Sequence, residues 1–338
     1  MLTCTGLGAI VALGVASLNS SRQLDPDSAM AEEISTVRFL ALGDINLGRK
    51  VGQEILMGDT LYPFRNVSQV LSNYDIVFGN LECTLSDQKG ETQHPRNKLI
   101  FTGPPAGGMA LKRGGVTVVS TANNHALDYG LRAHFETMEN LTQAGVLFAG
   151  TSLDSSVLYE PLIFSMNSIR FALFACTDIM NTEDLGWKRY VAAADTAKLL
   201  PRIRVYNDSV DVLIVSYHGG AEYTQTATQR TVAFAAQCIN AGADAFLGHH
   251  PHVPHALEVF EGRPVAYSLG NFVFSQPFAE WTQKSFALSM TINKTSAGVS
   301  LEVDCLPLVS GFQPYFTYDS TIATSVRERV MGSLGTIQ

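Results

Sequence analysis

Five short apolar segments, each followed by polar residues of the kinds that bind metal ions, most constrain the fold of this chain. The segments are residues 37–42, 74–78, 116–120, 212–216 and 243–247. Each is too short and too rich in apolar or β-branched residues for a helix, so each predicts a buried β-strand. Helical segments lie between several of them, and this alternation is typical of an α/β fold with a largely parallel or mixed sheet.

Two of the intervening segments have the apolar periodicity of amphipathic helices. In residues 127–141 the predicted apolar face carries Leu131, Phe135, Met138 and Leu141, and Gly145 is suited to the C-terminal cap. In residues 226–240 the corresponding face carries Val232, Ala236 and Ile239. Further strands are expected at residues 170–176, 264–268, 286–292 and 299–303, the last two as an antiparallel hairpin.

The composition and the N-terminus set the expected domain organisation. Of 338 residues, 46% are hydrophobic and 16% charged, which predicts a sizeable buried core. We expect one domain over residues 36–310 and a C-terminal extension over residues 311–338 that packs on it. Residues 1–35 contain an apolar run and a polar linker, which favours a signal or anchor and a protein exported or tethered at the cell envelope. No Lys or Arg precedes the run, so a buried helix in a cytoplasmic protein is the alternative.

Charge and cysteine content exclude other classes of function. The formal net charge is −8, which argues against nucleic acid or an anionic membrane as the main partner. The five cysteines are scattered without a CxxC motif, so we expect buried thiols and neither a disulfide framework nor a cysteine zinc site. They are Cys4, Cys83, Cys176, Cys238 and Cys305.

Polar side chains that follow the five strands predict a site with two metal ions. They are Asp44, Glu82, Asn124 with His125, His218, and His250 with His252. Ligands in open α/β sheets bind beyond the carboxyl ends of the strands, so these residues should lie together. Alone, each has a structural explanation, such as a helix cap or a hydrogen-bonded core histidine. Carboxylates, amides and imidazoles in combination suit two divalent Mn, Fe or Zn ions that share a carboxylate.

The stretches around these residues resemble the poly-γ-glutamate capsule synthesis protein family of the CapA type, which is related to calcineurin-like metallophosphoesterases. In the family's order, the matching stretches are residues 43–49, 80–82, 122–130, 218–223, 242–244, 248–252 and 267–272. The resemblance implies a four-layer α-β-β-α sandwich with a dimetal centre at the carboxyl edge of its sheets.

The resemblance also implies a role for each motif residue. The metal ligands would be Asp44, Glu82, Asn124, His218, His250 and His252. Glu82 would occupy the place of a bridging aspartate, and His125 would act on the leaving group as a general acid or charge stabiliser. Residues that orient ligands or substrate would be Asn46, Arg49, Asn80, Glu222, His249 and Asn271.

Two motifs depart from the phosphoesterase pattern. Asn46 occupies the position of a histidine, and Asn80 and Glu82 replace two aspartates. One of the two metal sites is therefore expected to bind weakly. The choice between His249 and His250 stays open, although the His-x-His spacing favours His250 with His252.

The expected function is that of a metal-dependent hydrolase in capsule or poly-γ-glutamate synthesis or processing. Water activated by two metal ions would attack a phosphoester or amide bond in a cell-envelope polymer or its precursor. The alternative is a non-catalytic, polymer-binding component of a membrane complex for capsule synthesis and export. A third possibility is an amidase or transferase acting on γ-glutamyl links. The sequence contains no GxSxG, HExxH or P-loop motif.

Overall fold

The computed structural model describes residues 34–332. The N-terminal segment predicted as a signal or anchor lies outside the described residues, as do Cys4 and residues 333–338. Within residues 34–332, no helix is long and apolar enough to cross a membrane. The four cysteines in this range are buried free thiols, as the sequence predicts.

The first sheet has eight strands. They are β1 (Ser35–Ile45), β2 (Ile76–Leu81), β5 (Val118–Ser120), β6 (Leu147–Ala149), β13 (Asn271–Val273), β14 (Lys284–Thr295), β15 (Gly298–Val309) and β16 (Tyr315–Phe316). The order is β16-β15-β14-β1-β2-β5-β6, and β13 pairs with the end of β1. The strands β1, β2, β5, β6 and β13 run parallel, while β14 to β16 form an antiparallel flank.

The second sheet has six strands and faces the first. They are β7 (Leu162–Met166), β8 (Ile169–Thr177), β9 (Val212–His218), β10 (Ala245–His249), β11 (Leu257–Phe260) and β12 (Arg263–Ala266). The order is β11-β12-β10-β9-β8-β7, with β8, β9, β10 and β12 parallel. Two short strands, β3 (Thr84–Leu85) and β4 (Thr102–Gly103), pair separately. Every strand that the sequence predicts overlaps an observed strand, and their first residues differ by up to two positions.

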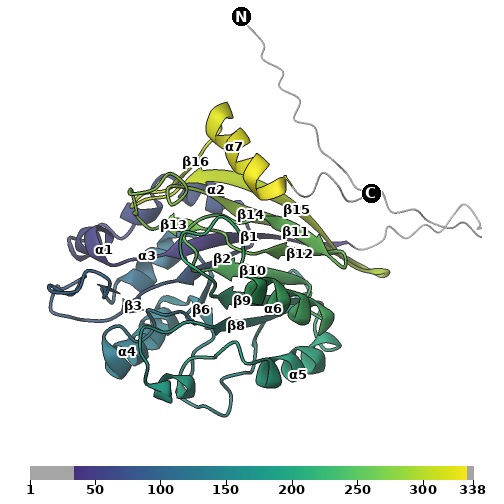
Figure 1. The fold of residues 1–338 in the computed structure, drawn as a ribbon, viewed down its shortest axis with the longest axis horizontal. Helices are drawn as coiled ribbons and strands as arrows, with labels where there is room; N and C mark the ends of the chain where they lie inside the picture. The colour runs from purple at the N-terminus through teal and green to yellow at the C-terminus, as the bar shows by residue number, and fades with distance from the viewer. Residues whose placement is uncertain (1–33, 333–338) are drawn as a thin grey trace, which may run out of the picture. The chain divides into compact units, whose positions relative to one another are not determined.

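Helices α1 to α6 cover the outer faces of the sheets (Figure 1). They are α1 (Arg49–Leu56), α2 (Ser68–Leu71), α3 (Gly107–Gly114), α4 (Gly130–Ala144), α5 (Thr196–Asn207) and α6 (Gln229–Asn240), with 3-10 turns η1 (Tyr62–Phe64) and η2 (Leu185–Arg189). The last helix is α7 (Ser320–Met331). Along β1, Phe39 packs between the sheets, whereas Leu40 packs toward α1 to α4. Along β9, Ile214 packs between the sheets, whereas Leu213 packs toward α5 and α6. This alternation of buried faces confirms the four-layer α-β-β-α sandwich.

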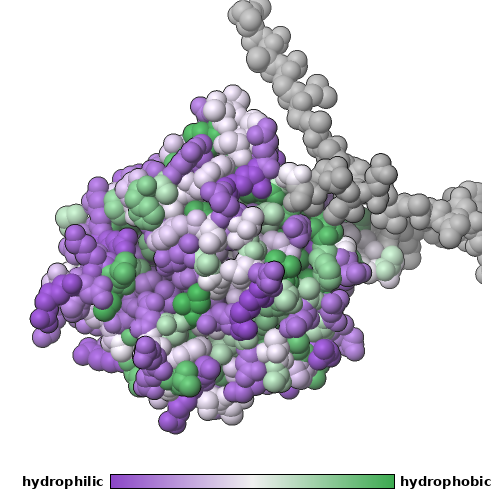
Figure 2. Space-filling model, in the orientation of Figure 1, coloured by the Kyte–Doolittle hydropathy of each residue, from purple (hydrophilic) through white to green (hydrophobic). Residues whose placement is uncertain are grey.

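The predicted apolar faces of two helices are wrong at one residue each. Leu131 of α4 is 41% exposed, whereas Met138 and Leu141 of the same predicted face are buried. Val232 of α6 is also 41% exposed, whereas Ile239 of its predicted face is buried. The helix α4 begins only at residue 130, because hydrogen-bonded turns occupy the preceding residues of the site motif. On the face of the molecule in Figure 2, hydrophilic and hydrophobic side chains are interspersed.

The chain segment 267–271 joins the carboxyl ends of the two sheets. The backbone N–H of Leu269 donates to the carbonyl of Gly248 at 3.0 Å, and that of Asp44 donates to the carbonyl of Gly270 at 2.9 Å. A Cβ atom on Gly43 would lie 1.9 Å from the Gly270 carbonyl oxygen. Glycine at this position therefore permits the close approach that brings the two strand edges together.

The C-terminal extension supplies part of the core. The strand β16 pairs with β15, and α7 packs against β14, β15 and β11. Val326 and Val330 of α7 are fully buried and belong to the apolar cluster between the sheets. The helix therefore contributes to the stability of the sandwich.

We expect Val326→Asp to lower the free energy of unfolding by about 3–5 kcal/mol, because it would bury a carboxylate with no counter-charge. Urea denaturation monitored by circular dichroism measures this change. Glu328→Ala, on the exposed side of the same helix, is the matched control and should change stability by less than about 0.5 kcal/mol. Equal effects of the two substitutions would contradict a core role for α7.

Candidate metal centre

Two buried carboxylates form the base of the site. Asp44 lies near the end of β1, Glu82 directly follows β2, and both are fully buried. Asn80 Nδ2 donates to Asp44 Oδ1 at 2.9 Å and lies 3.4 Å from Glu82 Oε2. The other oxygen of Glu82, Oε1, is buried and has no hydrogen-bond partner among the described residues. One carboxylate oxygen is thus left without compensation in the interior.

Imidazole nitrogens surround this oxygen. The Nε2 atoms of His125, His218 and His252 lie 3.8, 3.9 and 3.8 Å from Glu82 Oε1. These distances are too long for hydrogen bonds. Two groups of potential metal ligands result, and Glu82 is common to both. One group is Asp44, Glu82 and His252, and the other is Glu82, His218 and His250.

The histidine loop after β10 has a strained backbone. His250 has φ 95° and His252 has φ 60°, in the left-handed region that favours glycine. Such conformations cost about 1–3 kcal/mol each and cluster at ligand sites. Asn271 Oδ1 lies 2.9 Å from His252 Nδ1, so this pair fixes the ring with Nε2 directed toward Glu82. Asn271 thereby orients a potential ligand.

The loop after β5 contributes an amide and an imidazole. Asn124 Oδ1 lies 2.8 Å from His218 Nε2, which places an oxygen donor beside the second ligand group. His125 Nδ1 lies 2.8 Å from Asp128 Oδ2, and its ring stacks on Phe101 with centroids 4.3 Å apart. The ring of His125 is thus held with Nε2 facing the centre.

Burial and mutual charge shift the pKa values in opposite directions. Burial raises the pKa of Glu82 well above its ordinary value, and repulsion from Asp44 adds to the effect. Burial also acts to raise the pKa of Asp44, but the adjacent imidazoles of His249 and His252 outweigh it, so this pKa is well below its ordinary value. Burial, together with neighbouring histidines, lowers the pKa of His218 well below its ordinary value and that of His250 to about 3.

These features fit divalent metal ions. Metal-binding histidines must be neutral, and burial keeps His218 and His250 neutral at physiological pH. The unpartnered Oε1 of Glu82 lacks a counter-charge that a cation would supply. A mixed donor set of carboxylates, imidazoles and an amide oxygen suits Mn, Fe or Zn.

Asn46, His249 and Glu222 are among the predicted site residues that lie outside the two ligand groups. Asn46 Oδ1 accepts a hydrogen bond from the backbone N–H of Gly48 at 2.8 Å, and its Nδ2 is buried without a partner among the described residues. His249 is fully buried, with Nδ1 3.4 Å from Asp44 Oδ1, so it lies against one ligand. Glu222 is exposed next to Tyr223.

The sequence reasoning missed three residues that support the site. Asp128 orients His125, and its position three residues later in the same motif was an available signal. Asn181, in the loop after β8, accepts a hydrogen bond from Asn124 Nδ2 at 3.1 Å. Arg329 of α7 donates to the carbonyl of Pro254 at 2.7 Å, close to the histidine loop. No local pattern marks Asn181 or Arg329.

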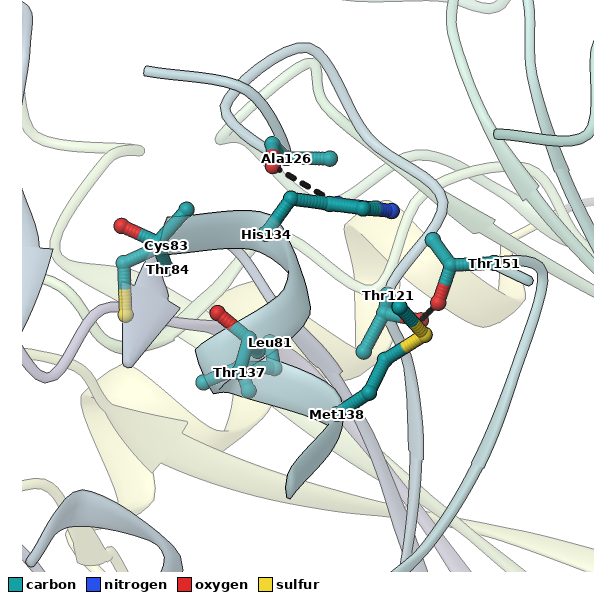
Figure 3. A pocket seen from close by; sticks show the side chains of 9 residues that line it. All are labelled: Leu81, Cys83, Thr84, Thr121, Ala126, His134, Thr137, Met138 and Thr151. Atoms are coloured by element: carbon teal, nitrogen blue, oxygen red, sulfur yellow. Dashed lines mark hydrogen bonds between the residues drawn. The ribbon is translucent and has the colours of Figure 1, made fainter. Parts of the chain in front are cut away.

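A small cavity lies beside the site (Figure 3). Leu81 and Cys83, which flank Glu82, line it together with Ala126, which follows His125. His134 Nδ1 lies 3.0 Å from the carbonyl oxygen of Ala126 and helps to fix this turn. The cavity has a volume of about 10 Å³, which suits a single water molecule and is too small for a substrate.

Comparison with known proteins identifies the family of the chain. The family model of the bacterial capsule synthesis protein PGA_cap matches residues 38–276. The chain belongs to this family. The family resemblance of the sequence motifs is thereby confirmed, and the part that matches contains every residue of the two ligand groups.

Relatives with curated names agree with this membership. The capsule biosynthesis protein CapA of Bacillus anthracis is 30% identical over 275 residues, which cover 79% of this chain and 66% of that protein. The PGA biosynthesis protein CapA of Bacillus subtilis (strain 168) is 30% identical over 275 residues, covering 79% of this chain and 70% of that protein. The chain thus spans about two thirds of these relatives' length.

Among solved structures, a putative 5′-nucleotidase from Staphylococcus aureus in complex with alpha-ketoglutarate aligns with a TM-score of 0.48. The sequences are 13% identical, and the alignment covers 86% of this chain and 57% of that chain.

We expect Glu82→Gln to stabilise the metal-free protein by about 1–3 kcal/mol at pH 7.5, because it removes an uncompensated buried carboxylate. A carboxyl group with a raised pKa costs stability as pH rises above its ordinary value of 4.5, so the gain should vanish near pH 4. Urea denaturation in EDTA at both pH values tests this expectation.

Glu139→Gln, on the exposed side of α4, is the matched control and should change stability by less than about 0.5 kcal/mol at either pH. A metal-free Glu82→Gln protein less stable than the wild type at pH 7.5 would contradict this description of the site.

Proposed function

We propose that the chain is a metal-dependent hydrolase that cleaves a phosphoester or amide bond in the synthesis or processing of a capsule polymer. The observation that carries this proposal is the position of Glu82. It belongs to both ligand groups, and its unpartnered Oε1 faces three imidazole Nε2 atoms. A shared buried carboxylate is the arrangement expected of a two-metal hydrolytic site.

The ligands divide between the two sheets. Asp44, Glu82 and His252 would hold one ion, while Glu82, His218 and His250, with the Asn124 oxygen, would hold the other. Bound divalent ions supply Lewis-acid activation of water and stabilise negative charge on the substrate. Asn46 uses its Oδ1 within its own turn, so the first site would have fewer protein ligands and the weaker affinity.

His125 is proposed to protonate the leaving group. Asp128 Oδ2, 2.8 Å from His125 Nδ1, would accept a hydrogen bond from that nitrogen and fix the tautomer and the ring orientation. The Nε2 atom then faces the centre from one side. A proton delivered from Nε2 would neutralise the oxygen or nitrogen that departs from the substrate.

The proposed substrate is an anionic cell-envelope polymer or its precursor. The names of the two Bacillus relatives, capsule biosynthesis and PGA biosynthesis proteins, support a polymer-related role. Membrane proteins of capsule synthesis would be the partners. A non-catalytic, polymer-binding function is the second candidate, because Asn46 leaves the first ligand group with a reduced donor set.

We expect His125→Ala to lower kcat/KM about 10²- to 10⁴-fold for an alkyl phosphate, whose alkoxide leaving group needs a proton. The loss should be much smaller for 4-nitrophenyl phosphate, because nitrophenolate departs without protonation. Equal losses on both substrates, with unchanged metal content, would contradict the assignment of His125 as the acid.

The same preparations should be tested for shortening of poly-γ-glutamate chains, which separates amide from phosphoester cleavage. If metal-loaded wild-type protein cleaves neither class of bond, the hydrolase proposal fails and the polymer-binding function remains.

A further inference from the structure

Arg49 is a half-buried cation beside the candidate metal centre. Its guanidinium carbon lies 4.8 Å from the ring centroid of Phe101 and 5.4 Å from that of Phe274. Nη2 donates to the carbonyl of Lys98 at 3.3 Å, while Nε is buried and has no hydrogen-bond partner among the described residues. Within residues 34–332, Arg49 forms no ion pair with an Asp or Glu. Its charge is therefore available to a ligand.

The two aromatic rings connect Arg49 to the centre. Phe101 stacks on His125 with centroids 4.3 Å apart, and Phe274 packs on His252 with centroids 4.8 Å apart. Arg49 is thus separated by one ring from the proposed acid and by one ring from a proposed metal ligand. A substrate group bound by Arg49 would lie next to the reacting bond.

The backbone at Arg49 is held in a costly conformation. Its φ of 52° lies in the left-handed region, although the residue has a long side chain. The backbone N–H donates to the carbonyl of Thr92 at 2.9 Å, which fixes this conformation. A non-glycine residue there costs about 1–3 kcal/mol, and such outliers cluster at ligand sites. The unusual backbone conformation and the absence of an ion pair are two separate observations, and both indicate that Arg49 is held for a ligand.

An exposed aromatic group extends from the same side of the site. Tyr223 stacks on His252 with centroids 5.9 Å apart, and its hydroxyl accepts a hydrogen bond from Gln276 Nε2 at 3.2 Å. Phe278 lies edge-on to Tyr223 with centroids 5.1 Å apart and is 65% exposed. Tyr223 therefore lies between the buried ring of His252 and the exposed ring of Phe278.

We propose that Arg49 forms an anion subsite that binds an oxyanion of the substrate beside the bond that is cut. The inference rests on the proposed hydrolytic function of the same centre. A guanidinium presents a planar fork that matches a carboxylate or a phosphate. The subsite offsets the negative charge of Asp44 and Glu82, which would repel such a group. The oxyanion comes either from carboxylates of a γ-glutamyl chain or from non-bridging phosphate oxygens.

Isothermal titration of metal-loaded protein tests the subsite with two separate probes, inorganic phosphate and tri-γ-glutamate. We expect Arg49→Met to weaken binding of at least one probe about 10- to 100-fold. Arg49→Lys keeps the charge without the fork and should give a smaller loss of affinity. Lys50→Met is the matched control, because it removes the same charge one residue away, where the amino group lies 5.7 Å from the Phe312 ring.

Each outcome decides the proposal. Weaker binding of phosphate alone, of tri-γ-glutamate alone or of both supports the subsite and identifies the source of the oxyanion. Unchanged binding of both probes, or equal losses in Arg49→Met and Lys50→Met, overturns it. If Arg49→Met loses metal or stability, the affinity of Arg49→Lys is used instead: a loss of affinity supports the subsite, and unchanged affinity for both probes overturns it.

The titration separates this inference from the function on which it rests, because it requires no turnover. A wild-type protein that binds anions through Arg49 but hydrolyses nothing would overturn the hydrolase proposal and leave the subsite intact. A hydrolase whose Arg49 variants bind both probes normally would overturn the subsite and leave the hydrolase proposal intact.

Discussion

The uncompensated carboxylate of Glu82 is the interaction on which the structure of the site depends. Burying an ionised carboxylate without a partner is among the most unfavourable events in folding. Here one oxygen is buried without a hydrogen bond, and Asp44 adds negative charge nearby. Divalent ions held by the two ligand groups would supply the missing positive charge. The site therefore lowers the stability of the metal-free protein and favours the binding of cations.

The fold meets this requirement by joining two sheets at their carboxyl ends. The strands β1 and β2 place Asp44 and Glu82, while β9 and β10 place His218 and the histidine loop. The segment 267–271 links both sheets, and Gly43 leaves room for its carbonyl groups. Neither sheet alone supplies a complete ligand group, so the sandwich must form before the centre does. Metal binding and the docking of the sheets should therefore be coupled.

The sequence predicts the strands well, and it predicts that polar residues gather at one edge of the sheets, because both follow local rules. A short apolar run marks a fully buried strand such as β9, and polar residues at parallel strand ends must meet at one edge. Helix faces were less predictable: Leu131 fits the 3.6-residue period, yet tertiary packing selects Ala133 and its neighbours. Contacts between distant segments left no local signal, so the hydrogen bond of Asn181 with Asn124 could not be predicted. The stacking of Arg49 on Phe274 was hidden for the same reason.

Metal stoichiometry tests the sharing of Glu82 most directly. Inductively coupled plasma mass spectrometry of the purified protein should find two transition-metal ions per chain after loading with Mn, Fe or Zn. His250→Ala and His252→Ala should each lose one ion, whereas Glu82→Ala should lose both, because each ligand group contains Glu82. A wild-type protein without stoichiometric metal, or a Glu82→Ala protein that retains both ions, would contradict the account.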